Sequence, residues 1–171
     1  MIKYLLPATL LMAGCNISTA SHERDAIRTK HPQQIVSAYS YYGWTESKNR
    51  KELTELVGVD PVETEWCAAF VNAVLHGEGI EGSETVSAFP LTARSFVTWG
   101  TEVKKPQSGD VVVFPRGEPW QGHVGFYVRT VMVEGVPNYL ILGGNQDNSV
   151  SLKLYPATQA IAIRRHSPQL L

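Results

Sequence analysis

Residues 64–75 read TEWCAAFVNAVL, in which a cysteine stands at the start of an almost wholly apolar segment. Thr64 is a favourable N-cap residue, and the apolar run continues to about His76 before Gly77, which predicts a buried helix. With Thr64 as the cap, Cys67 takes the third helical position, where unpaired N–H groups and the helix dipole favour a thiolate. Cys67 is therefore a candidate nucleophile, although packing as a small buried hydrophobe explains the same position.

The segments around this helix predict an α+β fold. Helical periodicity, caps and glycine stops predict three more helices, at 32–42, 49–57 and 92–99. After Pro106 the pattern changes to β-branched and aromatic runs, which predict strands at 111–114, 123–128, 139–142, 150–154 and 161–163. Because helices precede strands rather than alternate with them, we expect helices packed on a mostly antiparallel sheet of about five to six strands.

Composition narrows the range of partners. The chain has 171 residues, 43% of them hydrophobic, which suits one globular domain. Its 15 basic and 16 acidic residues give a net charge of −1, so nothing favours nucleic acid as a partner. The sequence lacks HExxH and any paired cysteine or close histidine cluster with zinc spacing, so neither a metal nor a cofactor is expected. We expect a monomer.

The N-terminus resembles an export signal, with Lys3 followed by an apolar run. Residues 11–15, LMAGC, resemble a bacterial lipobox, which predicts a signal at 1–14, an acylated Cys15, a tether at 15–31 and a domain at 32–171. Cleavage after Ala20, releasing a soluble secreted protein, is the alternative. Asn16 favours a periplasmic protein anchored to the outer membrane. A lipidated Cys15 would leave Cys67 without a disulfide partner in an oxidising compartment.

A cysteine nucleophile needs a base, and His123 is the best candidate of the five histidines. His76 lies nine residues beyond Cys67 on the same helix and cannot reach it. In residues 122–128, GHVGFYV, strand alternation places Val124 and Phe126 on one face and His123 on the other, between two glycines. A half-exposed strand histidine without a catalytic role is the structural alternative.

A third polar group would orient the imidazole, and residues 143–148, GGNQDN, follow the next predicted strand. Asn145 could accept the ring N–H through its amide oxygen, while Gln146 and Asp147 are alternatives for the same role. An ordinary polar turn between two strands explains this composition equally well.

Four segments in this order resemble the NlpC-type and CHAP-type papain-like cysteine peptidases and amidases of bacterial cell walls: TEWCAAFVN, PQSGDVVVF, GHVGFYV and LGGNQDNSV. The resemblance implies a compact papain-like domain with Cys67 as nucleophile, His123 as general base and Asn145 as orienting residue. Trp66 stands where CHAP relatives often have a glutamine that helps the oxyanion hole, so the Cys67 N–H becomes a candidate donor. Trp66 and Gln146 are expected to contact substrate, although packing of Trp66 as a core aromatic explains its position equally well. Residues 42–46, YGWTE, also look family-like, without an assignable role.

The expected function is therefore that of an exported, lipid-anchored cysteine amidase or endopeptidase that hydrolyses amide bonds in peptidoglycan peptides through an acyl-enzyme. Both the bond joining muramic acid to alanine and bonds within the stem peptide remain candidates. A wall-degrading effector or phage lysis factor, with an unidentified inhibitor or immunity partner, would share this chemistry. The alternative from another class is a non-catalytic peptidoglycan-binding or envelope-assembly lipoprotein with the same fold.

Overall fold

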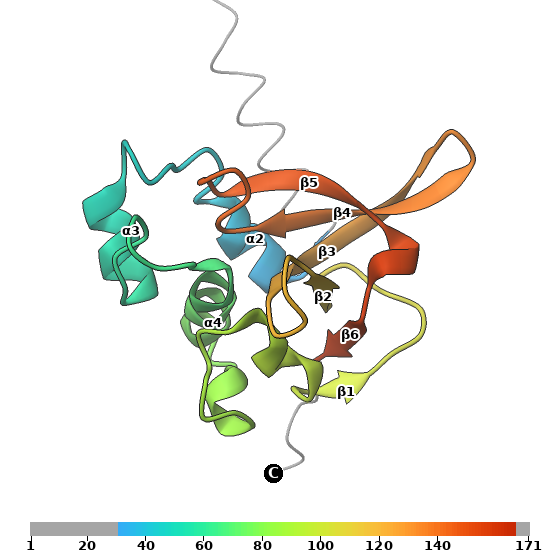
Figure 1. Cartoon of the computed structure of the whole chain (residues 1–171), viewed down its shortest axis with the longest axis horizontal. Helices are drawn as coiled ribbons and strands as arrows, with labels where there is room; N and C mark the ends of the chain where they lie inside the picture. The colour runs from blue at the N-terminus through green and yellow to red at the C-terminus, as the bar shows by residue number, and fades with distance from the viewer. Residues whose placement is uncertain (1–30, 167–171) are drawn as a thin grey trace, which may run out of the picture. The chain divides into compact units, whose positions relative to one another are not determined.

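A computed structural model describes residues 31–166, and its centre is a six-stranded antiparallel sheet of order β1-β6-β2-β3-β4-β5 (Figure 1). The α-helices within this range are α2 (Gln33–Tyr39), α3 (Arg50–Val57) and α4 (Cys67–Gly77). The strands are β1 (Thr101–Glu102), β2 (Val111–Pro115), β3 (Gly122–Val133), β4 (Val136–Gly143), β5 (Ser151–Pro156) and β6 (Ala162–Arg165). Short 3₁₀ helices are η1 (Ser83–Thr85), η2 (Ala93–Val97) and η3 (Ala157–Gln159). The α+β prediction is confirmed.

Helix α4 is the centre of the hydrophobic core. Eight of its eleven residues are buried, because apolar side chains surround the helix on almost every side. It packs in one cluster with α2, α3 and the sheet residues Val111, Val113, Val124 and Phe126. The helix begins at Cys67 with Trp66 as its N-cap, two residues later than a cap at Thr64 would predict. None of the helices described between residues 31 and 166 has the length and apolar character needed to cross a membrane.

Strand β3 separates two layers of side chains. Val124 and Phe126 join the α4 cluster, as the alternation predicted. On the other face, Tyr127 joins a smaller cluster with Val112, Phe114 and Ile141. His123, which pairs with Phe114 across the β2–β3 ladder, lies where β3 begins. Cys67 at the start of α4 and His123 at the start of β3 are therefore brought to the same region of the domain.

The β3–β4 hairpin is longer than the sequence predicted. Its two-residue loop, Glu134 and Gly135, has positive φ angles of 49° and 80°, as expected for a tight hairpin whose turn matches the strand twist. A register shift between Tyr127 and Arg129 marks the point where the predicted strand stopped and the observed one continues. In Figure 1 the hairpin is the orange ribbon that extends away from the remaining strands.

Candidate active site

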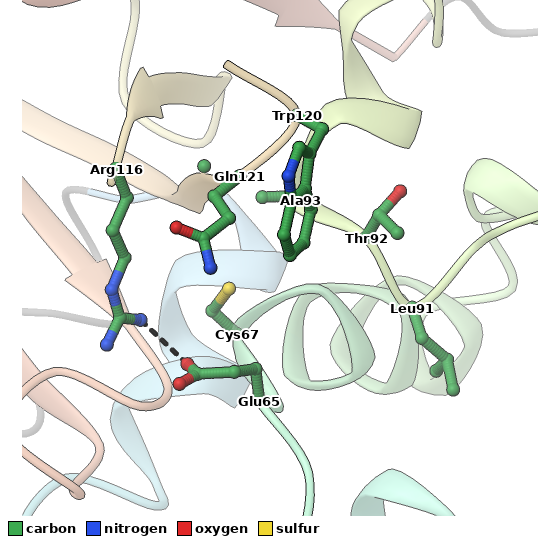
Figure 2. Close-up of a pocket in the computed structure, with 9 residues that line it drawn as sticks. Glu65, Cys67, Leu91, Thr92, Ala93, Arg116, Trp120 and Gln121 are labelled. Atoms are coloured by element: carbon green, nitrogen blue, oxygen red, sulfur yellow. Dashed lines mark hydrogen bonds and ion pairs between the residues drawn. The ribbon is translucent and has the colours of Figure 1, made fainter. Parts of the chain in front are cut away.

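Cys67 lies at the first residue of α4 and faces a pocket of about 180 Å³ (Figure 2). Only 3% of the residue is exposed, so the sulfur is reached through this pocket rather than from an open surface. The residues that line the pocket are Glu65, Cys67, Leu91, Thr92, Ala93, Arg116, Trp120, Gln121 and Gly122. Cys67 forms no disulfide bond within residues 31–166.

The thiol of Cys67 is not the preformed thiolate that the sequence predicted. Burial raises its pKa above the ordinary value, and this effect outweighs the backbone N–H groups of Val124 and Ala68, which act in the opposite direction. The thiol differs from the predicted thiolate for two reasons: α4 starts at Cys67 itself, and the sulfur is enclosed by other parts of the chain. At neutral pH the sulfur therefore carries its proton.

His123 is also enclosed, with 4% of the residue exposed. Its ring stacks on Tyr155 with centroids 5.3 Å apart, and Tyr155 stacks in turn on Phe114 at 4.6 Å. Burial lowers the pKa of His123 to about 4, and the positive charges of Arg116 and Lys153 act in the same direction. The imidazole is therefore neutral at neutral pH and can accept a proton.

Cys67 and His123 occupy neighbouring parts of one site. The backbone N–H of Val124, the residue after His123, interacts with the Cys67 thiol. His123 lines a second pocket, of about 300 Å³, and Arg116 lines both this pocket and the one that holds Cys67. The two predicted residues thus converge, as the fold requires if they act together.

Gln146, rather than Asn145, contacts the ring of His123. Its Oε1 lies 3.2 Å from His123 Nε2 in a buried hydrogen bond. Its Nε2 faces the backbone carbonyl of Ser151, and that of Gly143 at 3.4 Å. Because a carbonyl only accepts hydrogen bonds, the amide NH₂ must point to these oxygens and Oε1 to the ring. His123 must then carry its proton on Nε2, which leaves Nδ1 free as a base.

Asn145 takes a different partner. Its Nδ2 donates to Glu65 Oε2 at 2.7 Å, and the same carboxylate oxygen accepts a 2.7 Å bond from Arg116 Nη1. Asn145 therefore ties the 143–148 loop to the residue two positions before Cys67, and the hydrogen bond to the imidazole that was predicted for Asn145 comes from Gln146. The sequence contained both residues side by side but offered no means of choosing between them.

The loop that carries Gln146 is held in an unusual backbone conformation. Asn145, Asp147 and Asn148 have positive φ angles of 56°, 54° and 59°, which asparagine and aspartate tolerate better than most residues. Glu46 N–H donates to Asn148 O at 3.1 Å, and Thr45 forms a β-bridge with Ser149. Residues 42–46, YGWTE, thus hold this loop in place, a role that the sequence did not reveal.

Trp66 also helps to hold the 143–148 loop in place, and it does not line the pocket that Cys67 faces. It is fully buried, and its indole Nε1 donates to Glu46 Oε1 at 2.8 Å. A Cβ on Gly144 would lie 2.5 Å from the indole ring, so this glycine lets the loop rest directly on Trp66. Trp66 thus lines neither of the two pockets, whereas Gln146, also predicted to contact substrate, lines the second pocket and bonds His123.

His76 and the possible metal-binding groups of residues 31–166 lie outside this site or form no cluster. His76 pairs with Glu84 at 2.7 Å, at the far end of α4 from Cys67. Within the described part of the chain, no three histidine, cysteine, aspartate or glutamate side chains are grouped so that they could hold a metal ion. Lipidation of Cys15 concerns a residue outside the described range.

A helix that presents a cysteine at its first residue, against a sheet that presents a histidine and its amide partner, defines a papain-like α+β domain. The family model of the CHAP domain matches residues 59–145, slightly more than half of the chain, and the chain belongs to this family. No curated protein matches the chain. At the level of the family, a CHAP domain indicates a peptidoglycan hydrolase of the amidase or peptidase type.

The burial of His123 predicts a pH-dependent stability. Because its pKa falls from 6.5 to about 4 on folding, the unfolded chain binds more protons between these values. The stability that the neutral ring contributes is fully present above pH 6.5 and is lost as the pH falls from 6.5 to about 4. The total loss in the free energy of unfolding is about 3 kcal/mol. Urea unfolding at a series of pH values should therefore show a shallower acid loss for His123→Gln than for the wild type.

The control is Gln159→Ala, which alters an exposed, uncharged side chain of η3 and should keep the wild-type slope. Parallel acid losses in the wild type and His123→Gln would contradict the burial assigned to His123.

Proposed function

We propose that the chain is an exported cysteine amidase or endopeptidase that hydrolyses amide bonds in peptidoglycan peptides. Cys67 is the nucleophile, His123 the general base and Gln146 the residue that orients the imidazole. The observation that carries the proposal is the bond from His123 Nε2 to Gln146 Oε1, which keeps Nδ1 unprotonated in the ring next to Cys67. Family membership supports the substrate class.

The chemistry starts from a neutral pair, because burial disfavours both the thiolate and the imidazolium. As Sγ attacks the substrate carbonyl carbon, the thiol proton moves to His123 Nδ1. The imidazolium that forms is stabilised by Gln146 Oε1, whose hydrogen bond raises the pKa of His123. Collapse of the tetrahedral intermediate breaks the C–N bond and returns the proton to the leaving amine. Water, deprotonated by His123, then hydrolyses the thioester.

Release of soluble fragments from purified sacculi tests this mechanism. Cys67→Ala and His123→Ala should each lower the rate of release by at least about 10³-fold, because each removes a member of one catalytic unit. His76→Ala is the matched control and should keep the wild-type rate. Equal release by the wild type and Cys67→Ala would reject the enzyme and favour a non-catalytic wall-binding or envelope-assembly protein.

The proposal includes a lipid anchor on Cys15 and a periplasmic location at the outer membrane. Its support is the LMAGC segment alone. The mature protein should have a mass that begins at Cys15 with acyl chains attached, and metabolic labelling with a fatty acid should mark it. Cys15→Ala should lose the label, while Cys67→Ala, which alters the other of the two cysteines, should keep it. A mature N-terminus at Ser21 would show that the protein is secreted without an anchor.

A further inference from the structure

A thiol that attacks an amide needs hydrogen-bond donors for the negative oxygen that forms. The residue before Cys67 cannot supply one from its side chain, because Trp66 is buried and its indole N–H is bound to Glu46. The backbone N–H of Cys67 belongs to the first turn of α4, where N–H groups have no partner within the helix. A second donor must come from another part of the pocket.

Gln121 presents such a donor from the loop between β2 and β3. Its backbone N–H donates to Glu118 O at 2.8 Å, and its backbone oxygen accepts a 2.9 Å bond from Arg94 Nε. Its side-chain Oε1 accepts a 2.9 Å bond from the backbone N–H of Glu118. Since a backbone N–H only donates, the oxygen end of the amide is fixed by the loop. The NH₂ end must therefore be the one that faces away from the loop.

The free end of this amide points into the site. Figure 2 shows the Gln121 amide nitrogen directed toward the Cys67 sulfur, within the pocket that both residues line. Nothing among residues 31–166 accepts a hydrogen bond from this nitrogen. Gly117 leaves room for the Gln121 side chain in this position, because it has a φ of 56° and a Cβ there would lie 2.0 Å from Gln121 Oε1. The loop is thus built to hold one donor beside the nucleophile.

We propose that Gln121 is a catalytic residue whose amide Nε2 donates to the substrate oxygen during attack by Cys67, together with the backbone N–H of Cys67. This inference rests on the proposed role of Cys67 in acyl transfer. As the S–C bond forms, the π electrons of the carbonyl move onto its oxygen and the thiol proton passes to His123. Gln121 Nε2–H and Cys67 N–H then bind the oxyanion until the C=O bond re-forms and the leaving group departs.

Two reagents that react with the same sulfur separate this role from others. Acylation of Cys67 by p-nitrophenyl acetate passes through an oxyanion, whereas alkylation by iodoacetamide does not. Gln121→Ala should slow the acylation burst by about 10²-fold, as removal of one oxyanion donor does elsewhere, and leave alkylation within about twofold. Gln121→Glu keeps the size and the bond to Glu118 N–H but replaces the donor with a carboxylate oxygen, so it should be at least as slow.

Gln159→Ala, at an exposed glutamine of η3 outside both pockets, is the matched control and should acylate at the wild-type rate. Unchanged acylation in Gln121→Ala, or an equal loss of acylation and alkylation, would overturn the inference. The sacculus assay separates it from the proposed function. If acylation depends on Gln121 but no wall fragments are released, only the proposed peptidoglycan substrate is rejected. If wall fragments are released but acylation does not depend on Gln121, only the role of Gln121 is rejected.

Discussion

The orientation of the Gln146 amide decides which nitrogen of His123 is available as a base. Its NH₂ group is bound to backbone carbonyls that cannot donate, so its oxygen has to face the ring. The ring then holds its proton on Nε2 and keeps Nδ1 free for the proton of Cys67. Cys67 and His123 are both buried and neutral, so in the proposed mechanism proton transfer accompanies attack instead of preceding it. A reversed amide would place a donor against the ring and remove the base.

The rest of the domain keeps this amide in place. The 143–148 loop contains three residues with positive φ. Segment 43–46 pairs with Ser149 and Val150, which directly follow this loop. Gly144 lets the loop rest on Trp66, so the start of α4 and the loop share one packing contact. Asn145 adds a bond to Glu65 on the same approach to the helix. The spacing between Cys67 and His123 is thus set by core packing, which is dense and resists small displacements.

The sequence predicted those features that depend on local pattern. Apolar composition placed α4, and alternation placed His123 on the correct face of β3. It could not choose Gln146 over Asn145, because adjacent residues in an irregular loop point in directions set by φ angles that no periodicity encodes. The raised pKa of Cys67 was missed because burial comes from distant segments, whereas the helix N-terminus is a local signal. Gln121 was missed because its direction is fixed by hydrogen bonds within a turn, which hydrophobic periodicity does not encode.

The position of the His123 proton can be measured by nitrogen NMR of the histidine side chains in isotope-labelled protein, with the His123 signals assigned by comparison with His123→Gln. At neutral pH we expect a neutral ring with its proton on Nε2 and an unprotonated Nδ1. Gln146→Ala should weaken this preference, while Asn145→Ala should preserve it. A proton on Nδ1, or a doubly protonated ring at neutral pH, would contradict the role proposed for His123.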